Sequence, residues 1–390
     1  MLNRHILFYI GDLGGGGAER VMLNLLQNLD RNKYQLTLLL HSEKGAFYKK
    51  IPSDIQKVIV CWKTGKIHFL YRIYQLGNAI KKLNPDLVVS FRTASNIAVS
   101  RAKFLTRFRA GIILREGTNT ISWLKIKTKS FFLPIRKLEV KIFYSLADKI
   151  IANSDGIKND LVINFKINSN IIHTIYNPID FEGITKAIRQ SDNSPYTKQE
   201  HEKIILAIGR LDPPKAYQDM ISAFSIIRSV IPSRLLILGQ GSLESEIREQ
   251  IKKSQVEDFV KLHGFVNNPW VYLVNADVFL STSHWEGFPN ALIEAMACGV
   301  PPVATDCDFG PREIIHDGID GFLTPVGDIK YIADRVIELL QDDELRSRLA
   351  ENAKNRVHAF EISTIIQEYE TLFDEVLLSS SKRDETSLAY

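Results

Sequence analysis

The residues best able to do chemistry stand in one run of the second half of the chain, from Ser283 to Gly299. Pro289 suits the first position of a helix and Gly299 suits the residue after its last turn, so the run predicts a helix of about ten residues. Glu286 then lies in the loop ahead of this helix, whereas Glu294 lies inside it. Two carboxylates placed in this way cannot share one helical face. We therefore expect them to contact different parts of an extended ligand that lies across the helix N-terminus.

A second chemical feature follows the predicted strand Ile204–Ile208. The loop reads Gly-Arg-Leu-Asp-Pro-Pro-Lys and carries Arg210 and Lys215 on a backbone that two prolines stiffen. Arginine grips phosphate oxygens in bidentate fashion and lysine adds a mobile point charge, so the pair suits a diphosphate. Taken alone, the loop is equally compatible with two ordinary surface cations.

A glycine-rich turn follows the first predicted strand and includes Gly14, Gly15, Gly16 and Gly17. Glycines let the backbone approach a ligand closely, and the helix that follows offers unpaired N–H groups to an anion. The turn lacks both the G-x-G-x-x-G spacing of a dinucleotide site and the Gly-Lys-Ser/Thr ending of a P-loop. A flexible turn without any ligand is the alternative interpretation.

The elements that must position these residues are strands and helices in alternation. Short β-branched runs alternate with helical patterns along the whole chain, which indicates parallel sheets built from βαβ units. We predict an α/β fold of two Rossmann-like, doubly wound domains, with ligands bound beyond the carboxyl ends of the strands. The predicted strands are Ile6–Ile10, Gln35–Leu40, Val58–Cys61, Leu87–Ser90, Gly111–Leu114, Ile150–Asn153, Ile171–Ile175, Ile204–Ile208, Leu235–Leu238, Val260–Leu262, Val278–Ser281 and Val303–Thr305.

The polar, proline-containing segment Gln190–Lys203 is the best candidate for a linker between the two halves. We therefore predict an N-terminal domain over residues 1–195 and a C-terminal domain over residues 196–355. The pattern of Asn355–Leu378 indicates a helix, assigned to residues 356–378, and residues 379–390 are predicted to form a disordered tail.

Length and composition agree with an ordinary two-domain globular protein. The chain has 390 residues, of which 45% are hydrophobic and 24% charged, so wholesale disorder is excluded. Its three cysteines, Cys61, Cys298 and Cys307, form no CxxC pair, which argues against a disulfide scaffold and favours a reducing cytosol. No apolar run approaches the length of a membrane span, so we expect a protein that does not cross a membrane but can lie on one.

Charge is distributed unevenly along the chain. Residues 1–200 hold 31 Lys and Arg against 15 Asp and Glu, a net of +16, and residues 201–390 hold 18 against 30, a net of −12. A basic half can face nucleic acid, an anionic membrane or a phosphorylated substrate. An excess of cations on a solvated surface is the alternative.

The basic excess is greatest in residues 101–150, where 12 Lys and Arg stand against 3 Asp and Glu. Trp123, Phe131, Phe132 and Phe143 are interleaved with these cations. Basic plus aromatic composition suits an anionic membrane interface, so we predict peripheral attachment to the inner face of the cytoplasmic membrane. No standard nucleic-acid module is present, so we expect no nucleic-acid partner.

The run Glu-Gly-Phe-Pro-Asn-Ala-Leu-Ile-Glu at Glu286–Glu294 resembles the E-x7-E motif of the retaining glycosyltransferases of family 4. The flanking pieces agree in order across residues 6–330. These pieces are Gly14–Arg20, Gly209–Lys215, Gly239–Gly241, His263–Phe265, Asp308–Ile314 and Asp317–Leu323. The resemblance is closest to bacterial enzymes that extend lipid-linked glycans or O-antigen.

This resemblance implies a GT-B fold, in which two Rossmann-like domains face one another across a cleft and the last helix crosses back to the N-terminal domain. The C-terminal domain binds the nucleotide-sugar and the acceptor enters from the N-terminal one. Carried over by motif, Glu286 hydrogen-bonds hydroxyls of the donor sugar, Glu294 binds the ribose, and Arg210 and Lys215 hold the diphosphate. The other implied donor contacts are Gly15, Gly16, Gly17, Phe288, Pro289, Asn290, Gly264, Phe265 and Val266.

The resemblance also implies the reaction. A hexose or N-acetylhexosamine moves from a nucleotide-sugar to a lipid-linked or surface-polysaccharide glycan with retention of configuration, and a phosphate oxygen takes the acceptor's proton. UDP is preferred as the nucleotide by resemblance alone. No cofactor and no metal are expected, because cations and helix-end N–H groups can stabilise the departing diphosphate. Asp306-Cys307-Asp308 matches the D-x-D metal motif of the other glycosyltransferase fold only superficially.

One departure from the family concerns the N-terminal domain. Many relatives carry a histidine after a strand near the cleft, whereas this chain has Arg115, Glu116 and Asn119 in the matching region. These three are the candidates for the acceptor side. The alternatives to a transferase are a nucleotide-sugar epimerase of the same architecture and an inactive relative that binds nucleotide or glycan.

Overall fold

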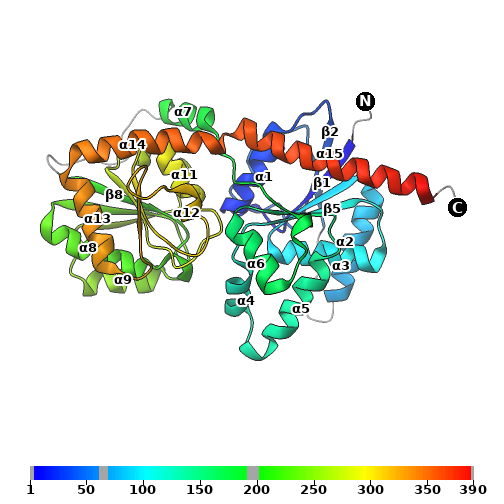
Figure 1. The fold of residues 1–390 in the computed structure, drawn as a ribbon, viewed down its shortest axis with the longest axis horizontal. Coiled ribbons are helices and arrows are strands. Elements are labelled where there is room, and N and C mark those ends of the chain that lie inside the picture. Colours follow the sequence, from blue (N-terminus) through cyan, green and yellow to red (C-terminus); the bar gives the residue numbers. More distant parts are fainter. Residues whose placement is uncertain (1–3, 61–68, 191–201, 388–390) are drawn as a thin grey trace. The chain divides into compact units, whose positions relative to one another are not determined.

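The computed structural model describes residues 4–60, 69–190 and 202–387 (Figure 1). Contacts divide the chain into two units, one formed by Met1–Pro178 with Ile362–Tyr390 and the other by Ile179–Glu361. Each unit is a parallel sheet covered by helices, so the predicted α/β fold of two doubly wound domains is confirmed.

The sheet of unit 1 has seven parallel strands in the order β3-β2-β1-β4-β5-β6-β7. The change of direction falls between β1 and β4, the place where open α/β sheets bind their ligands. The strands are β1 (Arg4–Tyr9), β2 (Tyr34–Leu40), β3 (Gln56–Ile59), β4 (Leu87–Phe91), β5 (Gly111–Glu116), β6 (Lys149–Ala152) and β7 (Ile172–Thr174).

Helices connect these strands and cover both faces of the sheet. The helix α1 follows the glycine-rich turn and buries Val21, Met22, Leu25 and Leu26, which recur at helical spacing. The helices of unit 1 before its last one are α1 (Gly17–Asn28), α2 (Phe69–Leu83), α3 (Thr93–Thr106), α4 (Thr120–Lys127), α5 (Leu133–Tyr144) and α6 (Asp155–Phe165).

The last helix, α15 (Ile362–Ser387), packs beside α1 on the sheet of unit 1. Its apolar residues recur at helical spacing and join the core of β1, β2 and β4, and they are Ile365, Ile366, Tyr369, Leu372, Phe373, Val376 and Leu377. The helix continues to Ser387, whereas a disordered tail was expected from residue 379 onward.

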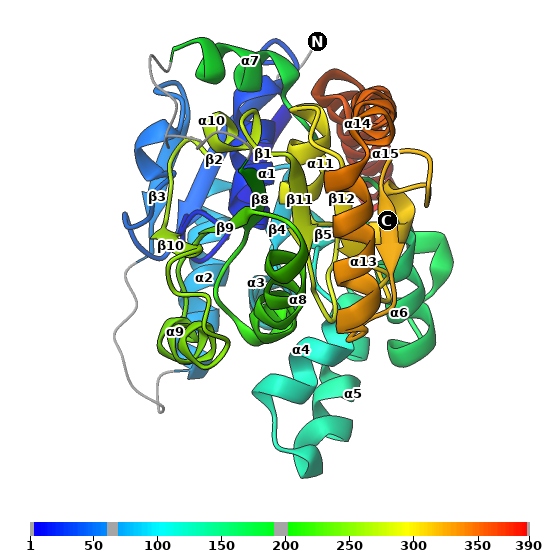
Figure 2. The ribbon, with the colours of Figure 1, turned by 90° about the vertical axis from the view of Figure 1, so that its left-hand side faces the viewer.

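The sheet of unit 2 has six parallel strands in the order β10-β9-β8-β11-β12-β13. Its strands are β8 (Lys203–Ile208), β9 (Ser233–Leu238), β10 (Val260–Gly264), β11 (Val278–Ser281), β12 (Pro302–Thr305) and β13 (Phe322–Thr324). The helices are α7 (Phe181–Arg189), α8 (Tyr217–Val230), α9 (Glu244–Lys253), α10 (Trp270–Leu273), α11 (Asn290–Ala297), α12 (Pro311–Ile314), α13 (Ile329–Gln341) and α14 (Asp343–Val357). Figure 2 shows β8 and β11 side by side at the middle of this sheet.

The chain enters and leaves unit 2 at one point. Ile179 and Glu361 form a parallel bridge, and the Ile179 N–H donates to the Phe360 carbonyl at 2.8 Å. Because the backbone must turn there, the predicted helix over Asn355–Leu378 is interrupted, and α14 and α15 are separated by a 3-10 turn at His358–Phe360.

The unit limits differ from the predicted domain limits. Unit 1 ends at Pro178 rather than at residue 195, because α7 already packs on α10 of unit 2. Most of the predicted linker, residues 191–201, lies outside the described residues, as does Cys61 at the end of one predicted strand. The other predicted strands are present within two residues of their predicted ends, and β13 is the strand that the sequence did not predict.

The burial of α15 leads to a prediction about stability. Phe373 is fully buried and makes edge contacts with Phe8, Tyr34 and Tyr369. Phe373→Ala should lower the free energy of unfolding of unit 1 by about 3–5 kcal/mol, because it leaves a cavity in the core. Chemical denaturation measures this loss. Leu378→Ala is the control, and an equal effect of both changes would show that α15 is not packed as described.

Candidate functional site

The candidate site lies at the carboxyl edge of the unit 2 sheet, where β8 and β11 are neighbours. Val278 pairs with Ile205 and Phe279 with Leu206, so the loops that follow the two strands emerge side by side. These loops are Gly209–Lys215 and Thr282–Pro289, which carry the predicted contacts Arg210, Lys215 and Glu286. The parallel topology therefore brings together residues such as Lys215 and Glu286, which are 71 positions apart in the sequence.

Backbone and hydroxyl contacts hold the two loops against each other. The Thr282 hydroxyl lies 3.1 Å from both the Lys215 and the Ala216 carbonyl oxygens. The His284 N–H donates to the Pro214 carbonyl at 2.8 Å. Ala216 has a left-handed backbone, with φ of 47° and ψ of 47°, at the turn from Lys215 into α8. The position of the Lys215 backbone is thus fixed from the β11 side.

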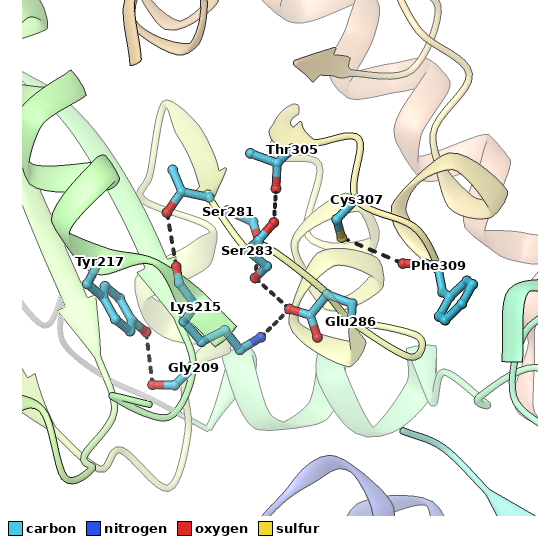
Figure 3. A network of polar contacts seen from close by, with 10 residues as sticks. Gly209, Lys215, Tyr217, Ser281, Ser283, Glu286, Thr305, Cys307 and Phe309 are labelled. Carbon is cyan, nitrogen blue, oxygen red and sulfur yellow. Dashed lines mark hydrogen bonds and ion pairs between the residues drawn. The ribbon is translucent and has the colours of Figure 1, made fainter. Parts of the chain in front are cut away.

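Lys215 and Glu286 form an ion pair between the two loops (Figure 3). The Lys215 ammonium contacts the Glu286 Oε1 atom, and the Ser283 hydroxyl donates to the same oxygen at 2.7 Å. The two charged side chains are 24% and 12% exposed, respectively, so both are largely withdrawn from water yet still reachable. Thr305 at the end of β12 donates to the Ser283 carbonyl and fixes that residue in turn. Charges held at low exposure are able to act strongly on a ligand.

Arg210 is placed apart from this ion pair. Its side chain is 76% exposed and lies 3.1 Å from Asp212 on its own loop. The loop itself is closely packed, because a Cβ on Gly239 would lie 1.8 Å from the Gly209 carbonyl oxygen and Gly239 has φ of +150°. The structure therefore brings Lys215 and Glu286 together and leaves the Arg210 guanidinium in solvent at the rim.

The helix α11 begins one residue later than the sequence predicts, with Pro289 at the N-cap and Asn290 as its first residue. Gly299 has φ of +74° just past the end, as predicted. Glu294 lies inside the helix and is 6% exposed. The Phe288 side chain packs edge-on against Phe360, so only its backbone is placed to serve a ligand.

Gly264, Phe265 and Val266 lie at the end of β10, the edge strand of this sheet. Phe265 is 42% exposed, and Gly264 has φ of +73°. Since β9 separates β10 from β8, these residues stand at the outer end of the same carboxyl edge. An extended ligand could reach them from Lys215 only by crossing the ends of β8 and β9.

The glycine-rich turn of unit 1 ends at the change of direction in that sheet. Gly15 has φ of +101°, and Gly16 is the N-cap of α1. Arg92, directly after β4, reaches Glu19 at 3.0 Å and Asp12 at 3.8 Å. Sequence analysis missed Arg92, whose φ of 77° and ψ of 141° belong to a region that non-glycine residues rarely adopt.

The three acceptor-side candidates are buried among partners of their own unit. The Arg115 Nε–H group donates to the Tyr369 hydroxyl at 2.8 Å, and its guanidinium also contacts Asn177. Burial raises the pKa of Glu116, although the Tyr144 hydroxyl and the nearby N–H groups of the backbone favour its charged form. Asn119 is the N-cap of α4. These contacts organise the carboxyl end of β5.

Other polar groups do not assemble into a metal site within the described parts of the chain. No cluster of three or more His, Cys, Asp or Glu side chains suited to a metal ion occurs there. In the D-x-D sequence, Arg312 binds both oxygens of Asp306, at 2.9 and 3.0 Å. Burial and the charge of Glu286 raise the pKa of Cys307 to about 12, so its thiol is protonated at neutral pH.

Comparison with known proteins places the chain in a family. Residues 15–182 match the family model described as Glycosyltransferase Family 4, and residues 188–356 match the model described as Glycosyl transferases group 1. An N-acetylgalactosamine-N,N'-diacetylbacillosaminyl-diphospho-undecaprenol 4-alpha-N-acetylgalactosaminyltransferase of Campylobacter jejuni is 32% identical over 90% of this chain and 94% of its own length. The lipopolysaccharide 1,6-galactosyltransferase of Salmonella typhimurium is 26% identical over 82% of this chain and 86% of its own length.

Solved structures show the same fold. Anabaena HepE in complex with UDP and glucose superposes with a TM-score of 0.76 at 21% identity, covering 95% of this chain and 99% of that one. The lipopolysaccharide outer core galactosyltransferase WaaB in its apo form has a TM-score of 0.70 at 20% identity, with 96% and 99% covered. The two units and their parallel sheets are thus those of a GT-B transferase. The chain belongs to glycosyltransferase family 4, and it is a glycosyltransferase.

Several residues of the site carry no mark in the sequence. Ser283 and Thr282 lie three and four residues before Glu286, but only the pairing of β8 with β11 shows that they fix Glu286 and Lys215. A hydroxyl directly after a strand of a parallel sheet is the signal that could have indicated them.

The strained backbone of Arg92 leads to a prediction. Arg92→Gly should be more stable than Arg92→Ala by about 1–3 kcal/mol, because both variants lose the ion pair with the buried Glu19 and only glycine relieves the backbone strain. Chemical denaturation measures the free energy of unfolding of both variants. At Arg109, an exposed position without positive φ, glycine should be no more stable than alanine. Equal stability of the two Arg92 variants would contradict the assigned strain.

Proposed function

We propose that this glycosyltransferase moves a hexose or N-acetylhexosamine from a UDP-sugar to a lipid-linked or surface glycan, with retention and without a metal ion. The observation that carries the proposal is the Lys215–Glu286 pair at the ends of β8 and β11 in a chain of family 4. The named relatives support the substrate classes, since the similar C. jejuni enzyme is named for transfer to a diphospho-undecaprenol glycan and the HepE complex contains UDP and glucose.

Each donor contact follows from the chemistry of its residue. Glu286 accepts hydrogen bonds from hydroxyls of the donor sugar, and Glu294 accepts them from the ribose. Lys215 and Arg210 neutralise the diphosphate, and the backbone N–H groups of Phe288 and Asn290 donate to it at the start of α11. Arg210 must move toward the ligand from its exposed position. The ion pair with Asp212 opposes this little, because exposed ion pairs are weak. Gly264, Phe265 and Val266 flank the base.

The reaction needs stabilisation of a departing UDP more than it needs a strong base. As the bond from the sugar to the diphosphate breaks, negative charge grows on the leaving oxygen. Lys215 is only 24% exposed, so water weakens its attraction for this charge less than it would at an exposed position. The acceptor hydroxyl attacks from the side that UDP leaves, and a phosphate oxygen receives its proton.

Unit 1 serves the acceptor in this proposal. Gly15, Gly16 and Gly17 close over phosphates with their backbone, and the carboxyl end of β5 lies beside the acceptor. Arg115 and Glu116 are buried and Asn119 caps α4, so they act by shaping this edge rather than by reaching far from it.

We further propose that the enzyme works at the inner face of the cytoplasmic membrane as a peripheral protein. The acceptor class supports this, as does the net charge of +9 in residues 101–150, from 12 cations and 3 acidic residues. Among the helices that the structure describes, none is long and apolar enough to cross a bilayer.

A transfer assay tests the proposed function. UDP-linked hexoses and N-acetylhexosamines, labelled in the sugar, are supplied with a synthetic undecaprenyl-diphosphate saccharide in detergent with EDTA. The label should move to the lipid, with the α-configuration of the donor kept. Conversion of the donor without any acceptor would instead indicate an epimerase, and binding without conversion would indicate an inactive relative.

The role of Glu294 leads to a separate prediction for donor binding. Glu294→Ala should weaken the affinity for the preferred UDP-sugar about tenfold or more, because the ribose hydroxyls lose a charged acceptor. Calorimetric titration measures this, with GDP- and ADP-sugars as comparisons. Glu246→Ala, an exposed carboxylate on α9, is the matched control. Unchanged affinity in Glu294→Ala would show that Glu294 does not bind the ribose.

A further inference from the structure

An exposed apolar stripe runs along α5 and the short 3-10 turn before it. Phe131, Ile135, Leu138 and Ile142 recur at helical spacing and are 83%, 61%, 54% and 50% exposed. Side chains spaced in this way lie on one face of a helix. Single exposed apolar residues are ordinary, but a contiguous row of four indicates a surface that binds another molecule or a membrane.

The stripe belongs to a helix that is otherwise firmly held. The opposite face of α5 buries Val140 and Tyr144, and Tyr144 donates to Glu116 at the end of β5. Glu139, also buried, is paired with Arg101 of α3 and with Arg136. The helix therefore needs no further partner to fold, and its exposed stripe is available for another purpose.

Cations surround the stripe. The segment from Thr120 to Leu146 contains one acidic residue, Glu139, which is already paired. Its six cations are Lys125, Lys127, Lys129, Arg136, Lys137 and Lys141. Lys125, Lys127 and Lys129 are exposed around the link between α4 and α5. Apolar and basic side chains are thus exposed on the same segment, residues 120–146, which we call the α4–α5 hairpin. The α4–α5 hairpin projects from its sheet (Figures 1 and 2).

A groove of about 710 Å³ runs along the stripe. Ile135, Leu138 and Ile142 of the stripe line it together with Lys127 and Lys129. Arg101 and Arg136 also line it, and both pair with Glu139. Apolar and cationic lining of this kind suits a phosphate group that continues into a hydrocarbon chain. A free anion would leave the apolar side chains uncovered, and a purely apolar ligand would leave the lysines without an anion.

We propose that the α4–α5 hairpin is the surface by which this enzyme enters an anionic bilayer. The stripe reaches the boundary of the hydrocarbon, the lysines meet lipid phosphates, and the groove seats the upper part of one phospholipid. A second copy of the chain is the competing occupant, but two such surfaces would bring six cations against six. Anionic headgroups compensate that charge, and an amphipathic basic helix in the interface plane is a known mode of attachment.

This inference rests on the proposed function for its consequence. The helix α4 begins at Thr120, four residues after β5 ends at Glu116, so a bilayer held by the hairpin lies near the carboxyl edge of the unit 1 sheet. A lipid-linked acceptor would then present its head to that edge without leaving the membrane.

Vesicle binding tests the surface itself, without any transfer reaction. Vesicles of phosphatidylcholine, with and without 30% phosphatidylglycerol, are sedimented with the full chain. We expect binding that requires the anionic lipid. Phe131→Ser with Ile135→Ser should lower the partition coefficient at least tenfold, and Lys125, Lys127 and Lys129→Gln should lower it roughly 100-fold. The matched controls lie in unit 2 and are Ile319→Ser with Val230→Ser, and Lys252, Lys253 and Lys261→Gln.

The outcomes are distinct. Equal binding of the hairpin variants and their controls would overturn the proposal. A wild-type dimer in sedimentation velocity that becomes a monomer in the Phe131→Ser, Ile135→Ser variant would also overturn it. Loss of binding only in the hairpin variants, with unchanged thermal stability, would support it. Transfer to the acceptor in detergent should be unaffected by these variants. If the wild type transferred no sugar in that assay, the proposed function would be contradicted, but the vesicle-binding result would still hold.

Discussion

The contact on which the candidate site depends is the ion pair between Lys215 and Glu286. Bringing two charges out of water is costly and rarely stabilises a fold, so this pair is better explained by what it does for a ligand than by what it does for stability. The parallel pairing of β8 with β11 makes the contact possible, and Thr282 and Ser283 hold the two ends in place. The proposed donor contacts add to this pair rather than break it, because a carboxylate has a second oxygen for a sugar hydroxyl and an ammonium has further N–H donors for a diphosphate oxygen.

The proposed acceptor side of unit 1 is organised by a different buried cation, that of Arg115. The Arg115 guanidinium joins the end of β5 to Tyr369 on α15 and to Asn177 just before the chain enters unit 2. The returning helix and the candidate acceptor edge therefore share one side chain, and the core that anchors α15 also fixes this edge. Glu116 extends the same network to Tyr144 and hence to the hairpin.

Much of the fold was predictable, because parallel strands buried on both faces appear as continuous apolar runs and because glycine and proline mark their ends. The three-residue strand β13 was missed, since Phe322–Thr324 is too short to show a pattern. The break between α14 and α15 was missed because the bridge from Ile179 to Glu361 is a tertiary contact. In the site, motif spacing indicated Glu286 and Lys215, but it could not show that they touch, nor that Arg210 stays in solvent. The strain at Arg92 has no signal in sequence, because residue type does not report φ.

The central claim is that Lys215 and Glu286 act on the donor as one unit, and a double-mutant cycle on kcat/KM tests it most directly. Lys215→Ala and Glu286→Ala are each expected to lower kcat/KM for the UDP-sugar by about 100-fold or more, and the double variant should lose little beyond the worse single one, as residues that act together do. Losses that add in full, with the double variant reduced by the product of the two single effects, would show that the residues act independently and would contradict the account.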